Sequence, residues 1–192
     1  MRASESNGLV DHFESVLGPV QMGWSTGPDG LPMPFQIVKF SAGPDADFVS
    51  YSTLGLSNTH FASPQSGRHI HQELLMLAPT EMRSDTVLSL LYQVGTAALS
   101  SGRPLLRGNV IGPAGPLTAN SEMTALYVTM PVYFPDEFAT YRGESDVVIA
   151  WLVPISSQEA DYVASHGWDA FEDQLVDQDP DLVDFMRPGM NL

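Results

Sequence analysis

The chain of 192 residues is 43% hydrophobic and 16% charged, which is typical of a globular protein and not of a disordered one. It contains no cysteine, so disulfide bonds and thiolate chemistry are excluded. The 23 acidic residues outnumber the 8 basic ones and give a net charge of −15, which repels nucleic acid and anionic membranes and attracts basic partners. Most of this charge lies near the C-terminus, since residues 136–192 hold 13 acids and 2 bases.

The start of the chain predicts a protein that stays in the cytoplasm. Residues 1–11 contain Arg2, Glu5 and Asp11 and lack the apolar core of a secretory signal. The longest strongly apolar stretch, residues 147–155, is too short to span a bilayer and contains a proline. We therefore expect a soluble cytoplasmic protein that binds no membrane.

The N-terminal third is expected to form one helix and three strands. Apolar residues recur at helical spacing over residues 8–17, and Gly18-Pro19 ends this helix. Two strands are predicted within residues 20–40, on either side of the turn Gly27-Pro28-Asp29-Gly30, with the second strand over residues 35–40. A third strand is expected over residues 47–53.

The middle of the chain contains the clearest helix. Residues 58–68 are polar and predict a loop, and residues 68–78 predict a strand that ends at a proline. Ser84 is the predicted N-cap of a helix whose apolar residues repeat at helical spacing and which stops at Gly102. Residues 103–118 contain three glycines and three prolines and predict an irregular connection.

The C-terminal part is expected to add two strands and two helices. The strands are predicted over residues 125–133 and 147–153, with Pro154 ending the second. Ser156 and Glu159 stand at capping-box spacing and predict a helix that ends near Gly167, and residues 168–176 predict another helical stretch.

The elements together predict an α+β fold with a mixed, largely antiparallel sheet packed with flanking helices. We expect one domain over residues 1–176, followed by an acidic tail over residues 177–192. The sequence leaves open whether this tail is mobile or docked on the domain.

One predicted strand carries the best candidate for a metal site. Side chains alternate along a strand, so His69, His71 and Glu73 are expected to share one face. Two histidines and a carboxylate can ligate a transition metal. A polar, solvent-facing strand face explains the same pattern without a metal and is the favoured interpretation, so no metal or cofactor is predicted.

Other catalytic motifs are missing from the sequence. It contains neither the Gly-x-Ser-x-Gly elbow of hydrolases nor the His-Glu-x-x-His motif of zinc proteases. The glycine-rich segment over residues 108–113 lacks the Gly-Lys-Ser/Thr of a phosphate loop. We therefore predict that the protein is not an enzyme.

Three blocks of sequence together resemble the suppressor of fused family. Residues 47–57 end in Thr53-Leu54-Gly55-Leu56-Ser57 and are similar to a family strand that ends in T-x-G-L-S. Residues 73–77, which begin with Glu-Leu, resemble the family's strand before its long helix, and residues 150–155 followed by Glu159 resemble its L-x-P-I…E block. The blocks keep the family's order, and the resemblance runs from about residue 10 to about residue 176.

The resemblance implies an α+β domain and a protein-binding role. The animal member of the family sequesters a transcription factor with this domain and a second, C-terminal domain, for which this chain is too short. Short bacterial relatives are often encoded beside polymorphic toxins and are proposed to be immunity proteins. Together with the acidic charge, the resemblance predicts a bacterial binding protein that neutralises a basic toxin or nuclease domain. A regulatory adaptor outside toxin systems and a metal-dependent protein centred on the histidine strand are the alternatives.

The predicted contact surface follows the charge. Acids in the most negative region are the expected contacts with a basic partner, and the oligomeric state is not predicted. These acids are Glu137, Glu144, Asp146, Asp169, Glu172 and Asp173.

Overall fold

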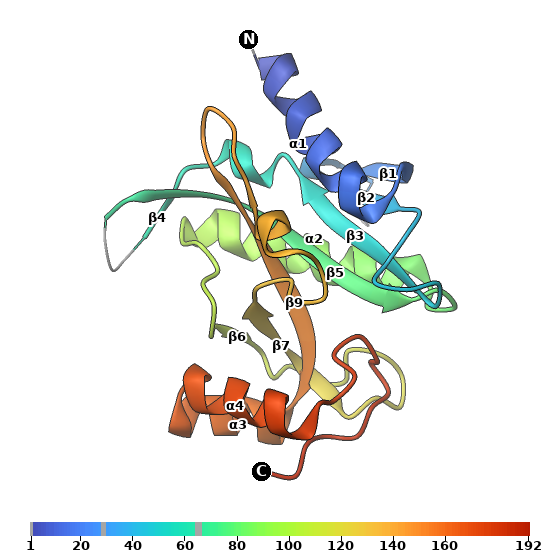
Figure 1. Cartoon of the computed structure of the whole chain (residues 1–192), viewed down its shortest axis with the longest axis vertical. Helices are drawn as coiled ribbons and strands as arrows, with labels where there is room; N and C mark the ends of the chain where they lie inside the picture. Colours follow the sequence, from blue (N-terminus) through green and yellow to red (C-terminus); the bar gives the residue numbers. More distant parts are fainter. Residues whose placement is uncertain (1, 28–29, 64–66) are drawn as a thin grey trace. The chain divides into compact units, whose positions relative to one another are not determined.

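The computed structural model describes residues 2–27, 30–63 and 67–192, which fall into two compact units (Figure 1). Unit 1 holds the residues up to 105 together with 130–151, and unit 2 holds residues 106–129 together with 152–192. Both units combine strands with helices; β5 and β9 pair parallel, and the pairs β1–β2, β2–β3, β3–β5, β4–β5, β6–β7 and β8–β9 are antiparallel. The predicted α+β class with a mixed, largely antiparallel sheet is confirmed.

Unit 1 is built on a sheet with the strand order β1-β2-β3-β5-β9. Strands β5 and β9 run parallel, with residues 71–75 beside residues 147–151. The short strands β4 and β8 pair with the starts of β5 and β9. The bounds are β1 Val20–Thr26, β2 Pro32–Phe40, β3 Phe48–Leu54, β4 Phe61–Ala62, β5 His69–Pro79, β8 Thr140–Tyr141 and β9 Val147–Ser156, with the 3-10 turns η1 Leu56–Asn58 and η2 Asp136–Ala139.

Helices α1 and α2 cover opposite faces of this sheet; α1 spans Arg2–Leu17 and α2 spans Ser84–Ser101. Phe13 of α1 packs on Phe40 of β2, with 5.5 Å between the ring centroids. Gly95 of α2 lies against Phe35 of β2, so closely that a Cβ there would come within 2.5 Å of the ring. Phe35 and Phe40 point to opposite faces of the strand because they are an odd number of residues apart.

Unit 2 combines short strands with a helical pair. Strand β6 (Val110–Ile111) pairs antiparallel with β7 (Met123–Thr129), which neighbours β9 in the strand order. Helix α3 (Ser157–His166) opens with the predicted capping box and ends at Gly167, after which α4 runs over Trp168–Gln178. Within the described part of the chain, no helix is long and apolar enough to cross a membrane.

The C-terminal segment beyond α4 is docked within unit 2. Leu182, Val183, Phe185 and Met190 are buried, although Asp181 and Asp184 lie next to them in the sequence. The Ser121 hydroxyl donates a hydrogen bond to the backbone carbonyl of Phe185. Of the two alternatives for residues 177–192, the structure thus favours the docked arm.

Several predicted boundaries are corrected. Ser84 is the first residue of α2 and not its N-cap, because its hydroxyl hydrogen-bonds the Tyr51 hydroxyl at 2.8 Å. Pro154 does not end its strand, since β9 continues to Ser156. The strand predicted over residues 125–133 ends at Thr129.

Other predicted segments differ in extent. The first helix begins at Arg2, six residues before the predicted start at residue 8. The predicted loop over residues 58–68 contains the end of η1 and strand β4, and its residues 64–66 lie outside the described residues. Pro28 and Asp29 of the predicted hairpin turn also lie outside them, while the flanking strands are present.

Candidate partner-binding groove

An open groove of about 790 Å³ lies in unit 1, where several strands begin or end. Its lining includes the last residue of β1, the first residue of β2, the last of β3 and the first of β9. Ten of its eighteen lining residues are polar, so the groove offers many hydrogen-bonding groups beside its apolar surface. The polar lining comprises Ser25, Thr26, Gln36, Ser57, Asn58, His60, His71, Tyr141, Glu144 and Ser145.

A buried carboxylate fixes the η1 side of the groove. Glu73 of β5 is 0% exposed, and its two oxygens accept hydrogen bonds from the turn that follows β3. One oxygen accepts from the backbone N–H groups of Gly55 (2.8 Å) and Ser57 (3.1 Å) and from the Ser57 hydroxyl (2.7 Å). The other accepts from the Thr53 hydroxyl (2.6 Å) and the Leu56 N–H (3.3 Å).

The hydrogen bonds around Glu73 affect its pKa and explain two of the sequence blocks. Burial raises the pKa of Glu73, and the hydrogen bonds from Thr53, Ser57 and Gly55 oppose that rise. Gly55 takes a φ of +100°, which lets the chain turn back onto the carboxylate. Two of the blocks singled out in the sequence, the T-x-G-L-S segment and the following Glu-Leu strand, are therefore the two sides of one hydrogen-bonded structure.

The predicted histidine face lies beside this network. His71 Nδ1 donates to the Ser57 carbonyl at 2.7 Å, so His71 and Glu73 do share a face of β5, as expected. That face is covered by η1 at Glu73 and is not solvent-facing along its length. The His60 ring lies 4.6 Å from the His71 ring and 5.6 Å from the His69 ring.

The metal alternative gains no support from this arrangement. Both oxygens of Glu73 are occupied by donors from the turn, so the carboxylate is already satisfied. Across residues 2–27, 30–63 and 67–192, no group of three or more histidine, aspartate or glutamate side chains is placed to hold a metal ion. His69, His71 and Glu73 therefore do not form a metal site in this arrangement.

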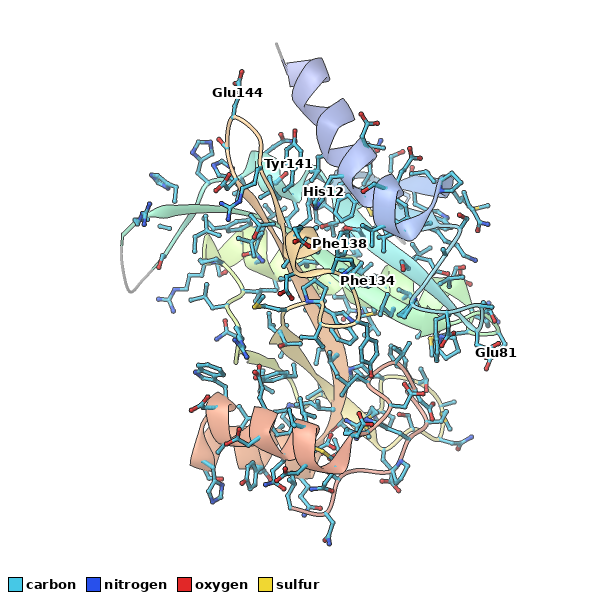
Figure 2. The ribbon with its side chains drawn as sticks, in the orientation of Figure 1. His12, Glu81, Phe134, Phe138, Tyr141 and Glu144 are labelled. Atoms are coloured by element: carbon cyan, nitrogen blue, oxygen red, sulfur yellow. The ribbon has the colours of Figure 1, made fainter. Side chains whose placement is uncertain are left out.

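An aromatic cluster of His12, Phe134, Phe138 and Tyr141 holds two elements that line the groove (Figure 2). His12 of α1 donates from Nε2 to the backbone carbonyl of Phe138 at 3.1 Å and stacks on its ring. The His12 ring also lies 5.6 Å from the ring of Tyr141, and Phe134 packs edge-on against Phe138. These contacts hold α1 and β8 together, and each contributes a lining residue, Leu9 from α1 and Tyr141 from β8.

Three of the predicted contact acids belong to unit 1. Glu144 lines the groove and is exposed on the loop between β8 and β9 (Figure 2). Asp146 is exposed on the same loop and forms an ion pair with Arg142. Glu137 is exposed in η2 and is not part of the groove lining. Of the three, Glu144 alone lines the groove, and the contact of each acid with a partner stays a prediction.

The other three predicted acids belong to unit 2, on α4. Asp169 and Asp173 are exposed. The Glu172 side chain is only 16% exposed and accepts hydrogen bonds from Arg107 Nε (2.9 Å), the Tyr127 hydroxyl (2.9 Å) and the Thr129 hydroxyl (3.1 Å). Glu172 therefore has a structural role within unit 2, and its contact with a partner stays a prediction.

The charges around Glu172 act on one another. Burial works to raise the pKa of Glu172, but Arg107 and the hydroxyl of Tyr127 outweigh it and hold the pKa below its ordinary value. Burial, followed by the bond to Glu172, raises the pKa of Tyr127. Arg107 also lies over the ring of Trp168, 4.7 Å from its centroid, which adds a cation–π contact.

A buried ion pair in unit 2 was missed by sequence reasoning. Arg187, 4% exposed, donates to both oxygens of Glu159 at 2.7 and 2.9 Å and to the Pro154 carbonyl at 3.1 Å. Burial works to raise the pKa of Glu159, yet the guanidinium and the N–H groups of Ser156 and Met190 lower it overall. The capping-box spacing predicted the bond to Ser156, whereas no sequence signal pointed to Arg187, 28 residues later.

Comparisons with known proteins give a family and a fold. The family model described as suppressor of fused protein matches residues 32–188. A comparison with curated protein sequences gives no significant match. Among solved structures, a suppressor of fused homologue from Neisseria gonorrhoeae is similar with a TM-score of 0.76 at 17% identity, over 97% of each chain.

Two further solved structures share the fold. A chain in the crystal structure of the Sufu–Fu complex has a TM-score of 0.68 at 15% identity, covering 98% of this chain and 89% of that one. Drosophila Suppressor of Fused has a TM-score of 0.66 at 14% identity, covering 94% of this chain and 48% of that one. The family match covers most of the sequence and includes both the Glu73 network and the Glu159–Arg187 pair. The chain belongs to the suppressor of fused protein family.

Proposed function

We propose that this protein binds another protein, and that in the cytoplasm it acts as an immunity protein that neutralises a basic toxin such as a nuclease. The observation that carries the binding role is family membership, together with the fold shared with a chain of the Sufu–Fu complex. That structure is named as a complex, so the fold forms part of a protein assembly there.

The groove of unit 1 supports a binding role at a defined place. Its volume of about 790 Å³ could take several side chains of a partner. The aromatic cluster and the Glu73 network hold two of its walls in place, so little order would have to be gained on binding. Glu144 at its border offers an exposed carboxylate to a basic side chain.

The charge supports a basic partner. A net charge of −15 attracts positively charged proteins over long range and speeds their encounter. Such steering weakens as salt is added, because ions screen exposed charges beyond about 10 Å at 0.1 M. Specificity would come from the few groups buried at the contact, and the groove is where we place them.

Affinity capture from a lysate of the native host tests this proposal. The full chain is used as bait at low and at moderate salt, in parallel with Glu144→Lys and with the control Asp161→Lys, an exposed acid of α3 in unit 2. Each reversal adds two positive charges, so both variants change the net charge from −15 to −13. The variants are thus matched in overall charge and differ only in place.

We expect a stoichiometric basic partner that is lost from Glu144→Lys and retained by Asp161→Lys. The purified partner is then assayed for nuclease or other toxic activity with and without the chain. Inhibition of that activity would support the immunity role, whereas a partner without toxic activity would favour the regulatory adaptor. No stoichiometric partner at either salt concentration would refute the binding function.

A further inference from the structure

Strand β1 stands at the end of the strand order of the sheet. In the described part of the chain, its one neighbour is β2. Its sequence, VQMGWST, contains no charge and no proline, although sheet edges usually carry such residues to prevent pairing with other chains. Residues 22–24 pair in continuous register with β2, between two register shifts.

An apolar pocket of about 320 Å³ lies beside this edge in unit 1. Trp24 of β1 and Ile37 of β2 form one side, and Leu88 and Tyr92 of α2 form the other. Asp85 of α2 also contributes to the lining, and its exposed carboxylate pairs with Arg83 at 2.9 Å. The pocket is therefore suited to a bulky apolar side chain.

The register shows that the edge and the pocket belong to one surface. Met22 pairs with Lys39, and Trp24 pairs with Ile37. The Lys39 ammonium lies 5.7 Å from the ring of Tyr51, whose hydroxyl bonds to Ser84 of α2. Met22 and Trp24 therefore point to the α2 side, and Met22 is 55% exposed there.

We propose that the open edge of β1 binds an extended segment of a partner protein, which adds as a further strand and places a bulky apolar side chain beside Trp24 in the pocket. The Val20 N–H is already bonded to the Glu14 carboxylate at 2.9 Å, so the added strand would pair with the outward-facing N–H and C=O groups of the following residues. Such groups are matched by a peptide backbone, which a small apolar molecule does not offer. Every second side chain of an added strand faces the α2 side, so one of them can reach the pocket.

Charge decides between a partner and a second copy of this chain. Each copy carries −15, so pairing two β1 edges brings strongly like-charged molecules together. A segment with basic residues next to its apolar anchor is attracted instead by the net negative charge of the chain. The family match begins at residue 32, so β1 lies outside the matched residues.

The test uses the full chain and peptides selected against it from a displayed random library. Selected peptides are titrated against the wild-type chain, Met22→Lys, Leu88→Glu and Met186→Lys. Met186 is a matched control, because it is also 55% exposed and lies in unit 2. Each peptide is also made with every second backbone nitrogen methylated, which keeps its side chains and removes donors that a strand needs.

We expect peptide affinity to fall at least about tenfold for Met22→Lys, for Leu88→Glu and for the methylated peptides, which corresponds to about 1.4 kcal/mol of binding free energy. For Met186→Lys the affinity should stay within about twofold of the wild-type value. Amide NMR shifts should appear over residues 20–26. Failure to select any peptide, or selected peptides whose affinity is indifferent to Met22→Lys and to methylation, would overturn the proposal. Dimerisation of the chain that Met22→Lys abolishes would also overturn it in favour of self-pairing.

The inference rests on the proposed function, since it names the kind of segment that a protein partner would offer. The two can fail separately. Host capture that is lost with Glu144→Lys but unchanged by Met22→Lys, together with no peptide binding, would remove the strand-addition site and leave the groove proposal standing. Peptide binding at β1 without any captured host partner would support the strand-addition site and remove the groove proposal.

Discussion

Replacing Arg187 with methionine should show how much the stability of unit 2 depends on the buried ion pair of Arg187 and Glu159. The substitution keeps most of the side-chain volume and removes the guanidinium, so Glu159 loses both bonds at 2.7 and 2.9 Å. The carboxylate remains 0% exposed, with the N–H groups of Ser156 (2.7 Å) and Met190 (2.9 Å) as its remaining donors. The variant therefore leaves a buried charge without its counter-charge.

The expected loss in the free energy of unfolding is about 3–5 kcal/mol, the usual result of removing one member of a buried ion pair. The Pro154 and Pro188 carbonyls also lose their donor, which adds to the loss. The surface pair of Arg83 and Asp85 supplies the control, since its side chains are 84% and 77% exposed. Arg83→Met should cost less than about 1 kcal/mol.

The pH dependence gives the same variant a second signature. The pKa of Glu159 is lowered in the folded wild type from an ordinary 4.5, so its contribution to stability is present above pH 4.5 and is lost as pH falls through the lowered pKa. Without Arg187, burial becomes the dominant influence and should raise that pKa. The difference between wild type and Arg187→Met should therefore be largest near neutral pH and shrink on acidification.

Urea unfolding with linear extrapolation measures the loss, and hydrogen exchange of the α3 amides assigns it to unit 2. Glu159→Gln introduced into Arg187→Met should restore part of the stability, because it removes the unpaired charge. A loss below about 1 kcal/mol, or a deficit that grows on acidification, would contradict the assigned role of the pair.

Three further predictions concern the other buried networks. Thr53→Val removes a hydroxyl that donates to Glu73 and accepts from the Leu74 N–H, and should lower the free energy of unfolding by about 1–3 kcal/mol in urea titrations. Because the pKa of Glu73 is raised in the folded state, the contribution of Glu73 to stability is present below pH 4.5 and is lost as pH rises through the folded pKa. Thr53→Val removes a hydrogen bond that lowers this pKa, so it should enlarge the loss of stability at higher pH. A loss of stability that is the same at every pH would contradict this prediction. Gly108→Ala places a Cβ 2.7 Å from Trp168 at a backbone φ of +90°. It should lower the free energy of unfolding by about 1–3 kcal/mol and shift the Trp168 fluorescence. An unchanged fluorescence spectrum would mean that the contact between residue 108 and Trp168 is not tight. Glu172→Gln weakens the bonds to Arg107, Tyr127 and Thr129 and should lower unit 2 stability by about 1–3 kcal/mol; unaltered unfolding would return Glu172 to the set of free surface acids.

Local signals in the sequence predicted the helices well. The apolar period of α2, its stop at Gly102 and the capping box of α3 each depend on residues within a few positions of one another. Ser84 shows the limit of such signals, because a hydroxyl suited to capping was instead taken by Tyr51, 33 residues earlier in the chain. Tertiary hydrogen bonds overrode the local preference there.

Long-range partners explain why the candidate site was only partly predicted. The alternation along β5 placed His71 and Glu73 on one face, but it could not show that Thr53 of β3 and the turn after it would donate five hydrogen bonds to Glu73. The groove draws its lining from segments between Leu9 and Val147, so no local pattern describes it. Glu144 was selected for its charge alone, and its place at the groove became visible only in the fold.

The parallel pairing of β5 with β9 has a consequence for the growing chain on the ribosome. Residues 71–75 meet residues 147–151 only after the intervening segment, which includes residues 106–129 of unit 2, has been synthesised. At about 5–20 residues per second, that interval lasts roughly 4–14 seconds after β5 is complete. During this time an apolar strand that includes Leu74 and Leu75, both fully buried in the finished protein, has no β9 beside it. A nascent chain paused before residue 151 is thus the form most in need of a holding chaperone.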